Sequence, residues 1–312
     1  MNNYWFPVRI AAAAVLFLST LSGARAALFT GLYAFGDSLT DTGNTSLASG
    51  GASPGAAYFN GRYSNGPVWL EGMATYLGMA APTPALAGGR DFAFGGAYTL
   101  SGGQVPTVAQ QVGMFTGGGG TFLPTDLVVV WGGANDFFLG GQTNPVIPAT
   151  NIAGIISTLA GAGARNIMVP NLPDLGDTPE LQGTNNSAAI LGASAWTSAF
   201  NASLYSQVDA LAANLGLNIL KLDVYTMGKQ LKANPGNYGF SNTTQSALLT
   251  GNAANAGAYL YWDTVHPTAR VHDIFAFNAA VAAPEPGSAA VLLFAGAAAT
   301  LRRRRSVARA AV

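Results

Sequence analysis

The chain of 312 residues carries 14 basic and 14 acidic side chains and contains no cysteine, so its formal net charge is zero. A neutral chain argues against nucleic acid as a partner, because binding to phosphates needs many cationic contacts. The lack of cysteine excludes disulfides, thiolate metal sites and a thiol nucleophile. The hydrophobic content of 49% predicts a globular domain with enough apolar side chains for one substantial core.

The first 26 residues have the pattern of a secretory signal peptide. Arg9 precedes an apolar stretch from Ile10 to Leu21, and Ala24-Arg25-Ala26 offers small residues to a signal peptidase. An apolar stretch of about twelve residues suits a signal peptide better than a membrane span, which needs about 20. A buried N-terminal helix is the alternative. We therefore expect residues 1–26 to be removed and the protein to be exported.

In chain order, the hydrophobic pattern of residues 27–283 alternates short apolar runs with longer helical segments, as in one α/β domain. It predicts a strand at Leu28–Phe35, helices at Val68–Leu77 and Val105–Phe115, a strand at Asp126–Trp131, a helix at Asn151–Leu159, a strand at Asn166–Val169, a helix at Ser187–Leu215, a strand at Leu217–Leu222 and a helix at Val224–Ala233. This alternation predicts a three-layer α/β/α fold, in which a mostly parallel sheet has helices on both faces.

The far end of the chain has three parts in a distinctive order. Pro284-Glu285-Pro286 is followed by an apolar segment over Gly287–Leu301 and then by Arg302-Arg303-Arg304-Arg305. A cationic cluster directly after a marginal membrane segment stays on the cytoplasmic side of a bilayer. An ordinary C-terminal helix is the alternative, and it fits this order badly.

This tail resembles the PEP-CTERM sorting signal of Gram-negative bacteria that make exopolysaccharide. The resemblance implies that residues 284–312 hold the protein at the membrane transiently and are then cleaved by an exosortase-like protease. It also implies delivery to the cell surface or the extracellular matrix.

Polar residues follow the predicted strands at one edge of the sheet. Ser38, Asn135 and Asp174 each come just after a strand, and the carboxyl ends of parallel strands meet at the edge where active sites lie. We therefore expect these three residues to share an edge. Asp174 is expected to shape its turn and is given no catalytic role.

A serine, a histidine and an aspartate form the candidate catalytic set. Ser38 lies in the glycine-led turn Gly36-Asp37-Ser38-Leu39, and a serine becomes a good nucleophile only beside a base. The chain has only two histidines, and His266 has Asp263 three residues before it. A tight turn would let this carboxylate accept from one ring nitrogen while the other nitrogen faces Ser38. We expect Ser38 to be the nucleophile, His266 the base and Asp263 its orienting partner.

Each of these residues also has an ordinary structural interpretation. Ser38 could be a turn or N-cap residue, and His266 could be a surface side chain before the helix that starts after Pro267. His272 lies within that helical pattern and is expected to be structural. Two histidines without clustered acidic partners are a poor ligand set, so no metal is expected.

Two further segments could supply donors for an oxyanion. Gly95-Gly96-Ala97 follows an apolar segment, and glycine lets a backbone N–H approach a substrate without a Cβ in the way. Gly133-Ala134-Asn135-Asp136 places a side-chain amide just past the buried strand. Taken alone, either segment could be an ordinary turn or helix cap.

Taken together and in this order, the four segments resemble the GDSL, or SGNH, family of esterases and lipases. The resemblance covers Phe35 to Ala276 and implies the SGNH-hydrolase fold, without a cofactor. It implies that Ser38 is the nucleophile, that Gly96 and Asn135 join Ser38 in the oxyanion hole, and that His266 acts with Asp263.

Other segments place the chain closer to the lipase/esterase branch of this family. Tyr58–Pro67 and Val169–Gly176 look like segments of that branch. Asp91 departs from it, because the branch commonly has an asparagine there, and this puts a local hydrogen bond in doubt.

The expected function is hydrolysis of carboxylic esters, either short acyl or lipid esters, by an exported serine hydrolase. The sorting tail favours an alternative, an O-acetyl esterase that acts on exopolysaccharide. A third possibility is a surface or matrix protein with an inactive hydrolase fold. Acyl-chain length and the alcohol depend on loops such as Ala48–Ala57 and Asn234–Ala258, whose composition does not indicate them.

Overall fold

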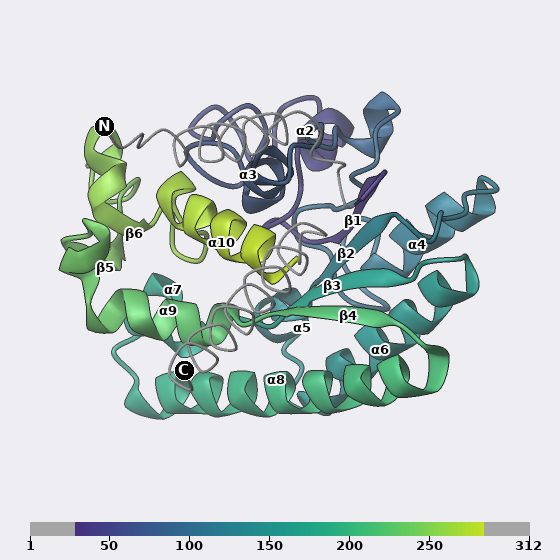
Figure 1. The fold of residues 1–312 in the computed structure, drawn as a ribbon. Coiled ribbons are helices and arrows are strands. Elements are labelled where there is room, and N and C mark those ends of the chain that lie inside the picture. The colour runs from purple at the N-terminus through teal and green to yellow at the C-terminus, as the bar shows by residue number, and fades with distance from the viewer. Residues whose placement is uncertain (1–28, 284–312) are drawn as a thin grey trace, which may run out of the picture. The chain divides into compact units, whose positions relative to one another are not determined.

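The computed structural model describes residues 29–283 and has a parallel four-stranded sheet at its centre (Figure 1). The sheet contains, in spatial order, β1 (Leu32–Gly36), β2 (Leu127–Trp131), β3 (Asn166–Pro170) and β4 (Asn218–Leu222). The predicted α/β fold with a parallel sheet is thereby confirmed. The expected signal peptide, residues 1–26, and the expected sorting tail, residues 284–312, lie outside the described residues.

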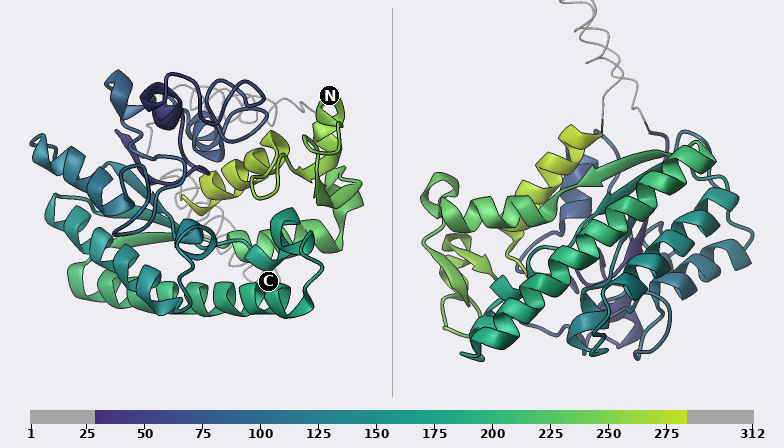
Figure 2. Two further views of the ribbon diagram at one scale, coloured as in Figure 1. Left: turned by 180° about the vertical axis from the view of Figure 1, so that it is seen from behind. Right: turned by 90° about the horizontal axis from the view of Figure 1, so that it is seen from below.

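Helices cover both faces of this sheet, with α10 and α8 on opposite sides of it (Figure 2). One layer contains α3 (Trp69–Tyr76) and α10 (Ala269–Ala282), and the other contains α4 (Val108–Gly117), α6 (Val146–Gly161) and α8 (Ser187–Leu215). The remaining helices are α2 (Asn44–Ala48), α5 (Ala134–Phe138), α7 (Pro179–Gln182), α9 (Val224–Ala233), η2 (Ala85–Ala87), η3 (Leu175–Asp177), η4 (Pro235–Tyr238) and η5 (Ala253–Ala258).

Aromatic side chains join each helical layer to the sheet. On one face, the Trp131 ring lies 5.3 Å from Trp69 of α3 and 6.2 Å from Phe275 of α10, measured between ring centroids. On the other face, Tyr33 of β1 meets Phe115 of α4 at 5.4 Å. Because alternate residues of a strand point to opposite faces, the continuous apolar run of β2 is buried on both sides.

The helix boundaries predicted from apolar periodicity agree with the structure for some helices and differ for others. α8 and α9 match their predicted ranges, whereas α6 begins at Val146 instead of Asn151. Its extra first turn contains Pro148, and proline is tolerated there because the first N–H groups of a helix have no intrahelical acceptor.

Within residues 29–283, no helix has the length and apolar character needed to cross a bilayer.

A second, two-stranded sheet was not predicted. It pairs β5 (Asn242–Ser246) with β6 (Tyr259–Tyr261) in parallel. The sequence of β5, Asn-Thr-Thr-Gln-Ser, has no apolar alternation, because its side chains are largely exposed. β6 leads directly into the loop that carries Asp263 and His266.

An extended segment, residues 90–94, pairs with the free side of β1 and extends the main sheet by hydrogen bonding. Ala34 N–H donates to the carbonyl of Arg90 at 3.1 Å, and Phe92 N–H donates to the carbonyl of Ala34 at 2.7 Å. Phe94 N–H then bonds the carbonyl of Gly36 at 3.2 Å. Since this segment runs parallel to β1, it delivers Gly96 to the edge where Ser38 lies.

Gly36 is where β1 ends and the turn that carries Ser38 begins. Gln111 of α4 clamps both sides of its backbone, because Oε1 accepts from Gly36 N–H and Nε2 donates to the Gly36 carbonyl, both at 2.8 Å. A Cβ at residue 36 would overlap the carbonyl oxygen of Trp131 in the neighbouring strand. The glycine is therefore a steric requirement of the strand pairing.

We expect Gly36→Ala to lower the free energy of unfolding by about 1–3 kcal/mol, as overpacking does in a close-packed interior. Gly154→Ala is the matched control, because a Cβ at this position of α6 would meet nothing within 4 Å. The control should gain about 0.5–1 kcal/mol from helix propensity. Urea unfolding of both variants tests this, and equal stability of Gly36→Ala and wild type would contradict it.

Candidate active site

Ser38 and His266, which lie 228 positions apart in sequence, meet at the carboxyl edge of the sheet. Ser38 Oγ lies 2.8 Å from His266 Nε2, and His266 Nδ1 lies 2.6 Å from Asp263 Oδ2. The structure thus brings together the three side chains that were expected to be catalytic. The alternatives of an isolated turn serine and a lone surface histidine do not describe this arrangement.

Short turns hold these side chains. After β1, the N–H groups of Thr40 and Asp41 both donate to the carbonyl of Asp37 at 3.0 Å, which closes a tight turn around Ser38. Ser38 is 7% exposed and the His266 side chain 15% exposed, so both are largely buried but keep some contact with solvent.

The Asp263 carboxylate is a stable anion. Although burial opposes ionisation, the charge of His266 and hydrogen bonds to the carboxylate lower the pKa of Asp263 to about 2. A fixed anion at Nδ1 holds the imidazole in the tautomer whose Nε2 can accept the serine proton. Beside Ser38, burial raises the pKa of Asp37 to about 6, and its carboxylate accepts the N–H of Leu39 at 3.1 Å.

The expected oxyanion donors are the N–H groups of Ser38 and Gly96 and the side-chain amide of Asn135. Within residues 29–283, neither the N–H of Ser38 nor that of Gly96 forms a hydrogen bond. Gly96 has φ +84°, a left-handed conformation that favours glycine. Asn135 Nδ2 donates one proton to the carbonyl of Ala97 at 3.0 Å, and its second proton has no partner in the described part of the chain.

Asp136 ties the helix that carries Asn135 to the loop that carries Gly96. Its two carboxylate oxygens accept the N–H of Thr99 at 3.0 Å and the Thr99 hydroxyl at 2.7 Å. Gly96 and Asn135 are linked in this way, and each has an N–H that meets no acceptor within residues 29–283. Free N–H donors are what a developing negative charge on oxygen requires.

The buried carboxylate of Asp91 stabilises the segment that precedes the loop of Gly96. It accepts the N–H and the hydroxyl of Thr42, both at 2.7 Å, and the N–H of Ala93 at 3.0 Å. Burial, with a further contribution from the charge of Asp41, raises the pKa of Asp91 well above its usual range. Asp91 therefore pairs with its neighbours as a hydrogen-bond acceptor, at the position where the branch commonly has an asparagine.

Two residues that were given no catalytic role form other contacts. His272 is buried, its Nδ1 accepts the N–H of Trp69 at 3.2 Å, and burial lowers its pKa to about 3. Asp174 caps the turn at Gly176 and forms an ion pair with Lys229. No group of three His, Asp or Glu side chains in residues 29–283 could hold a metal ion.

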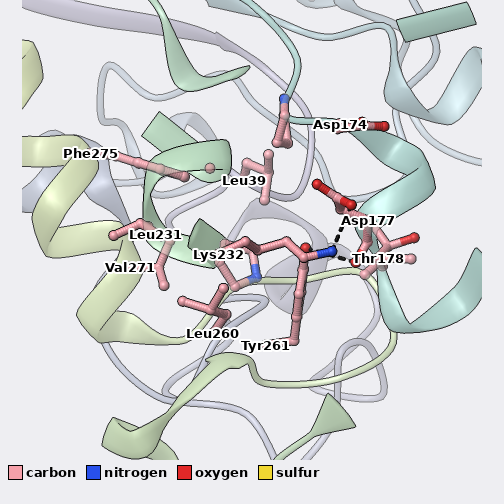
Figure 3. A pocket seen from close by; sticks show the side chains of 14 residues that line it. Leu39, Asp174, Asp177, Thr178, Leu231, Lys232, Leu260, Tyr261, Val271 and Phe275 are labelled. Atoms are coloured by element: carbon pink, nitrogen blue, oxygen red, sulfur yellow. Dashed lines mark hydrogen bonds and ion pairs between the residues drawn. The ribbon is translucent and has the colours of Figure 1, made fainter. Parts of the chain in front are cut away.

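A pocket with a volume of about 60 Å³ has Leu39, the residue after Ser38, in its lining (Figure 3). Leu39, Leu231, Leu260, Val271 and Phe275 form its apolar side, and Asp174, Asp177 and Thr178 lie on the other side. Leu39 and Val265, which line it, adjoin the catalytic side chains, whereas Ser38 and His266 do not line it. The loops expected to form substrate walls, Ala48–Ala57 and Asn234–Ala258, do not contribute to this pocket either.

One contact of the site was missed from the sequence. The Tyr58 hydroxyl donates to Asp263 Oδ2 at 2.7 Å across 205 positions of sequence. Tyr58 belongs to an aromatic segment with family resemblance, but no local pattern indicates which side chain a tyrosine hydroxyl will meet.

Sequence and structure comparisons show which known proteins this chain is similar to. The model of the family described as GDSL-like Lipase/Acylhydrolase matches residues 32–277. A phosphatidylcholine-sterol acyltransferase of Aeromonas hydrophila is 29% identical, over 75% of this chain and 68% of its own length. A GDSL esterase/lipase of Arabidopsis thaliana is 28% identical, over 77% of this chain and 86% of its own. A solved lipolytic G-D-S-L protein of Veillonella parvula aligns at 14% identity with a TM-score of 0.46, covering 80% of this chain and 95% of its own.

The family match covers most of the chain and contains Ser38, Gly96, Asn135, Asp263 and His266. The protein therefore belongs to the GDSL-like lipase/acylhydrolase family and is a carboxylic ester hydrolase.

Proposed function

We propose that this protein is an exported serine hydrolase that cleaves short acyl or lipid esters through an acyl-enzyme on Ser38. The observation that carries the proposal is the continuous hydrogen-bonded chain from Ser38 Oγ through His266 to Asp263, at 2.8 Å and 2.6 Å. Such a chain activates a hydroxyl that is otherwise a poor nucleophile.

In the proposed mechanism, His266 Nε2 takes the Ser38 proton as Oγ attacks the ester carbonyl carbon. Asp263 stabilises the imidazolium, and the oxyanion accepts hydrogen bonds from the N–H groups of Ser38 and Gly96 and from the Asn135 amide. His266 then gives its proton to the departing alcohol. A water molecule activated by His266 hydrolyses the acyl-enzyme, which releases the acid and returns the proton to Ser38.

Two observations support esters with an apolar acyl part. The relative from Aeromonas hydrophila is named for a lipid substrate, phosphatidylcholine. Large apolar side chains are also exposed in the segments that follow β1, residues 90–94 and β2: Leu47 of α2, Phe59, Leu100 and Leu139. Exposed apolar groups around a site favour contact with apolar substrates.

A fluorophosphonate probe should label wild-type protein and should not label Ser38→Ala, because the probe reacts with a serine that an adjacent base activates. Ser157→Ala is the control, since this serine lies in α6 and its hydroxyl bonds the carbonyl of Ala153 within the helix. Equal labelling of wild type and Ser38→Ala, measured by intact-protein mass, would remove Ser38 from the proposed role. Absence of label on the wild type would favour an inactive surface or matrix protein.

Asn135→Ala should lower kcat by about 10²–10³, because one donor to the oxyanion is lost. Asn278→Ala is a matched control, since its amide also donates to a backbone carbonyl, that of Ile274 in α10 at 2.8 Å. Steady-state kinetics on a p-nitrophenyl ester tests both variants, with thermal unfolding to establish that each is folded. If Asn135→Ala kept most of the wild-type kcat, the oxyanion assignment would be wrong.

An O-acetyl esterase acting on exopolysaccharide is the second candidate, because the sequence of residues 284–312 resembles a sorting signal of exopolysaccharide producers. Rates on p-nitrophenyl esters of graded acyl length and on acetylated polysaccharide separate the candidates. We expect the p-nitrophenyl esters to have the higher kcat/KM. Release of acetate from the polysaccharide alone would favour the second candidate.

We also propose that residues 1–26 are a signal peptide and that residues 284–312 are a sorting tail removed by an exosortase-like protease at the membrane. The order of charged, apolar and small residues at each end supports this. The mass of the mature chain, recovered from the surface or matrix of the producing cell, tests both cleavages. Recovery of the uncleaved chain in the cytoplasm would contradict export.

A further inference from the structure

The carboxylate of Asp263 accepts four hydrogen bonds. Oδ1 accepts the backbone N–H groups of Val265 at 2.8 Å and His266 at 2.7 Å. Oδ2 accepts His266 Nδ1–H at 2.6 Å and the hydroxyl of Tyr58 at 2.7 Å. Among residues 29–283, each oxygen therefore has two donors, and Tyr58 supplies the one donor that comes from outside the turn of Asp263 itself.

The Tyr58 ring is held by packing on both sides. Its centroid lies 6.4 Å from Trp262 in an edge-to-face arrangement at 84°, and 6.1 Å from Tyr63 at 60°. Trp262 belongs to a small buried cluster with Ala247, Ala256 and Tyr259, and Tyr58 packs against this cluster. The hydroxyl is thus presented to Asp263 by a ring whose position does not depend on the hydrogen bond alone.

The same loop also contacts the histidine. Tyr63 lies 5.1 Å from the His266 ring between centroids, and its hydroxyl is 2.9 Å from Ser53 Oγ. Its ring occupies the space that a Cβ at residue 95 would fill, next to the loop of Gly96. The segment that contains Tyr58 and Tyr63 therefore donates a hydrogen bond to Asp263 and places a ring against His266.

The donor role of Tyr58 persists over the pH range in which esterases work. Burial, and then the hydrogen bond to Asp263, raise the pKa of Tyr58 above its usual value. The phenol therefore stays protonated and donates, while the Asp263 carboxylate stays ionised and accepts.

We propose that Tyr58 is a positioning residue for the serine hydrolase reaction, acting on His266 through the carboxylate of Asp263. This inference rests on the proposed function of Ser38, His266 and Asp263. The hydroxyl fixes the rotation of the carboxylate, so that Oδ2 stays aligned with Nδ1. It also draws negative charge toward itself, which weakens the attraction between the carboxylate and an imidazolium.

Tyr58→Phe tests the role, because it keeps the ring against Trp262 and Tyr63 and removes only the hydroxyl. We expect kcat on a p-nitrophenyl ester to fall about tenfold, as for loss of one hydrogen bond to a charged group. KM should stay within about twofold, since no contact with substrate is lost. Fluorophosphonate labelling of Ser38 should slow by a similar factor.

The pH profile of Tyr58→Phe distinguishes a positioning role of the hydroxyl from a role of the ring in packing alone. In Tyr58→Phe, the acid limb of kcat/KM should move to higher pH, because a carboxylate with one donor fewer holds the imidazolium more strongly. The other titratable groups near the imidazole, Asp37, Tyr63 and His272, are unchanged in this variant. A fall in kcat with an unmoved acid limb would mean that the phenol only supports the loop, and it would overturn the proposal.

Tyr76→Phe is the matched control. The Tyr76 hydroxyl donates to Asp273 Oδ1 at 2.8 Å on the exposed surface between α3 and α10, so the same type of bond is lost away from Ser38. Its kcat and pH profile should equal those of wild type. Wild-type kinetics in Tyr58→Phe would overturn the role of Tyr58 alone, whereas failure of wild-type protein to react with the fluorophosphonate would overturn the proposed function.

Discussion

The saturated carboxylate of Asp263 is the constraint on which the rest of the site depends. Its own turn supplies two backbone donors, the histidine supplies a third, and a tyrosine from the first loop of the domain supplies the fourth. Burying a carboxylate is costly unless its oxygens are hydrogen-bonded. Full pairing keeps Asp263 charged, and the charge in turn fixes the imidazole that faces Ser38.

Buried carboxylates organise the surrounding loops in a similar way. Asp41 accepts the N–H groups of Gly43 and Asn44 at 2.7 and 2.6 Å, and Gly95 N–H at 2.9 Å. Asp91 and Asp136 bind the turns on either side of Gly96. Where these loops lack a regular ladder, the carboxylates accept their backbone N–H groups, and they also hold the loops that carry Gly96 and Asn135, the proposed oxyanion donors. The same burial raises the pKa values of these three aspartates.

Regular elements could be predicted where a single face or both faces of a segment are buried. The five apolar residues of β2 and the helix α8 follow directly from their patterns. β5 was missed because its polar side chains leave no periodic signal, and residues 90–94 were missed as a sheet extension because pairing with β1 depends on backbone groups alone. The first turn of α6 was missed because the helix was predicted to begin at Asn151, although proline is tolerated in a first turn such as the one that contains Pro148.

The sequence by itself determined which chemical groups are available: two histidines, one of them with an aspartate three residues before it, and a serine and an amide that each follow a predicted strand. These signals are local, since a turn or a strand end involves only neighbouring residues. The tertiary structure decided what local patterns do not encode: the meeting of Ser38 with His266, the clamp of Gln111 on β1, and the bond from Tyr58 to Asp263. Each joins groups separated by 75 to 228 positions, so its geometry arises only when the layers pack around the sheet.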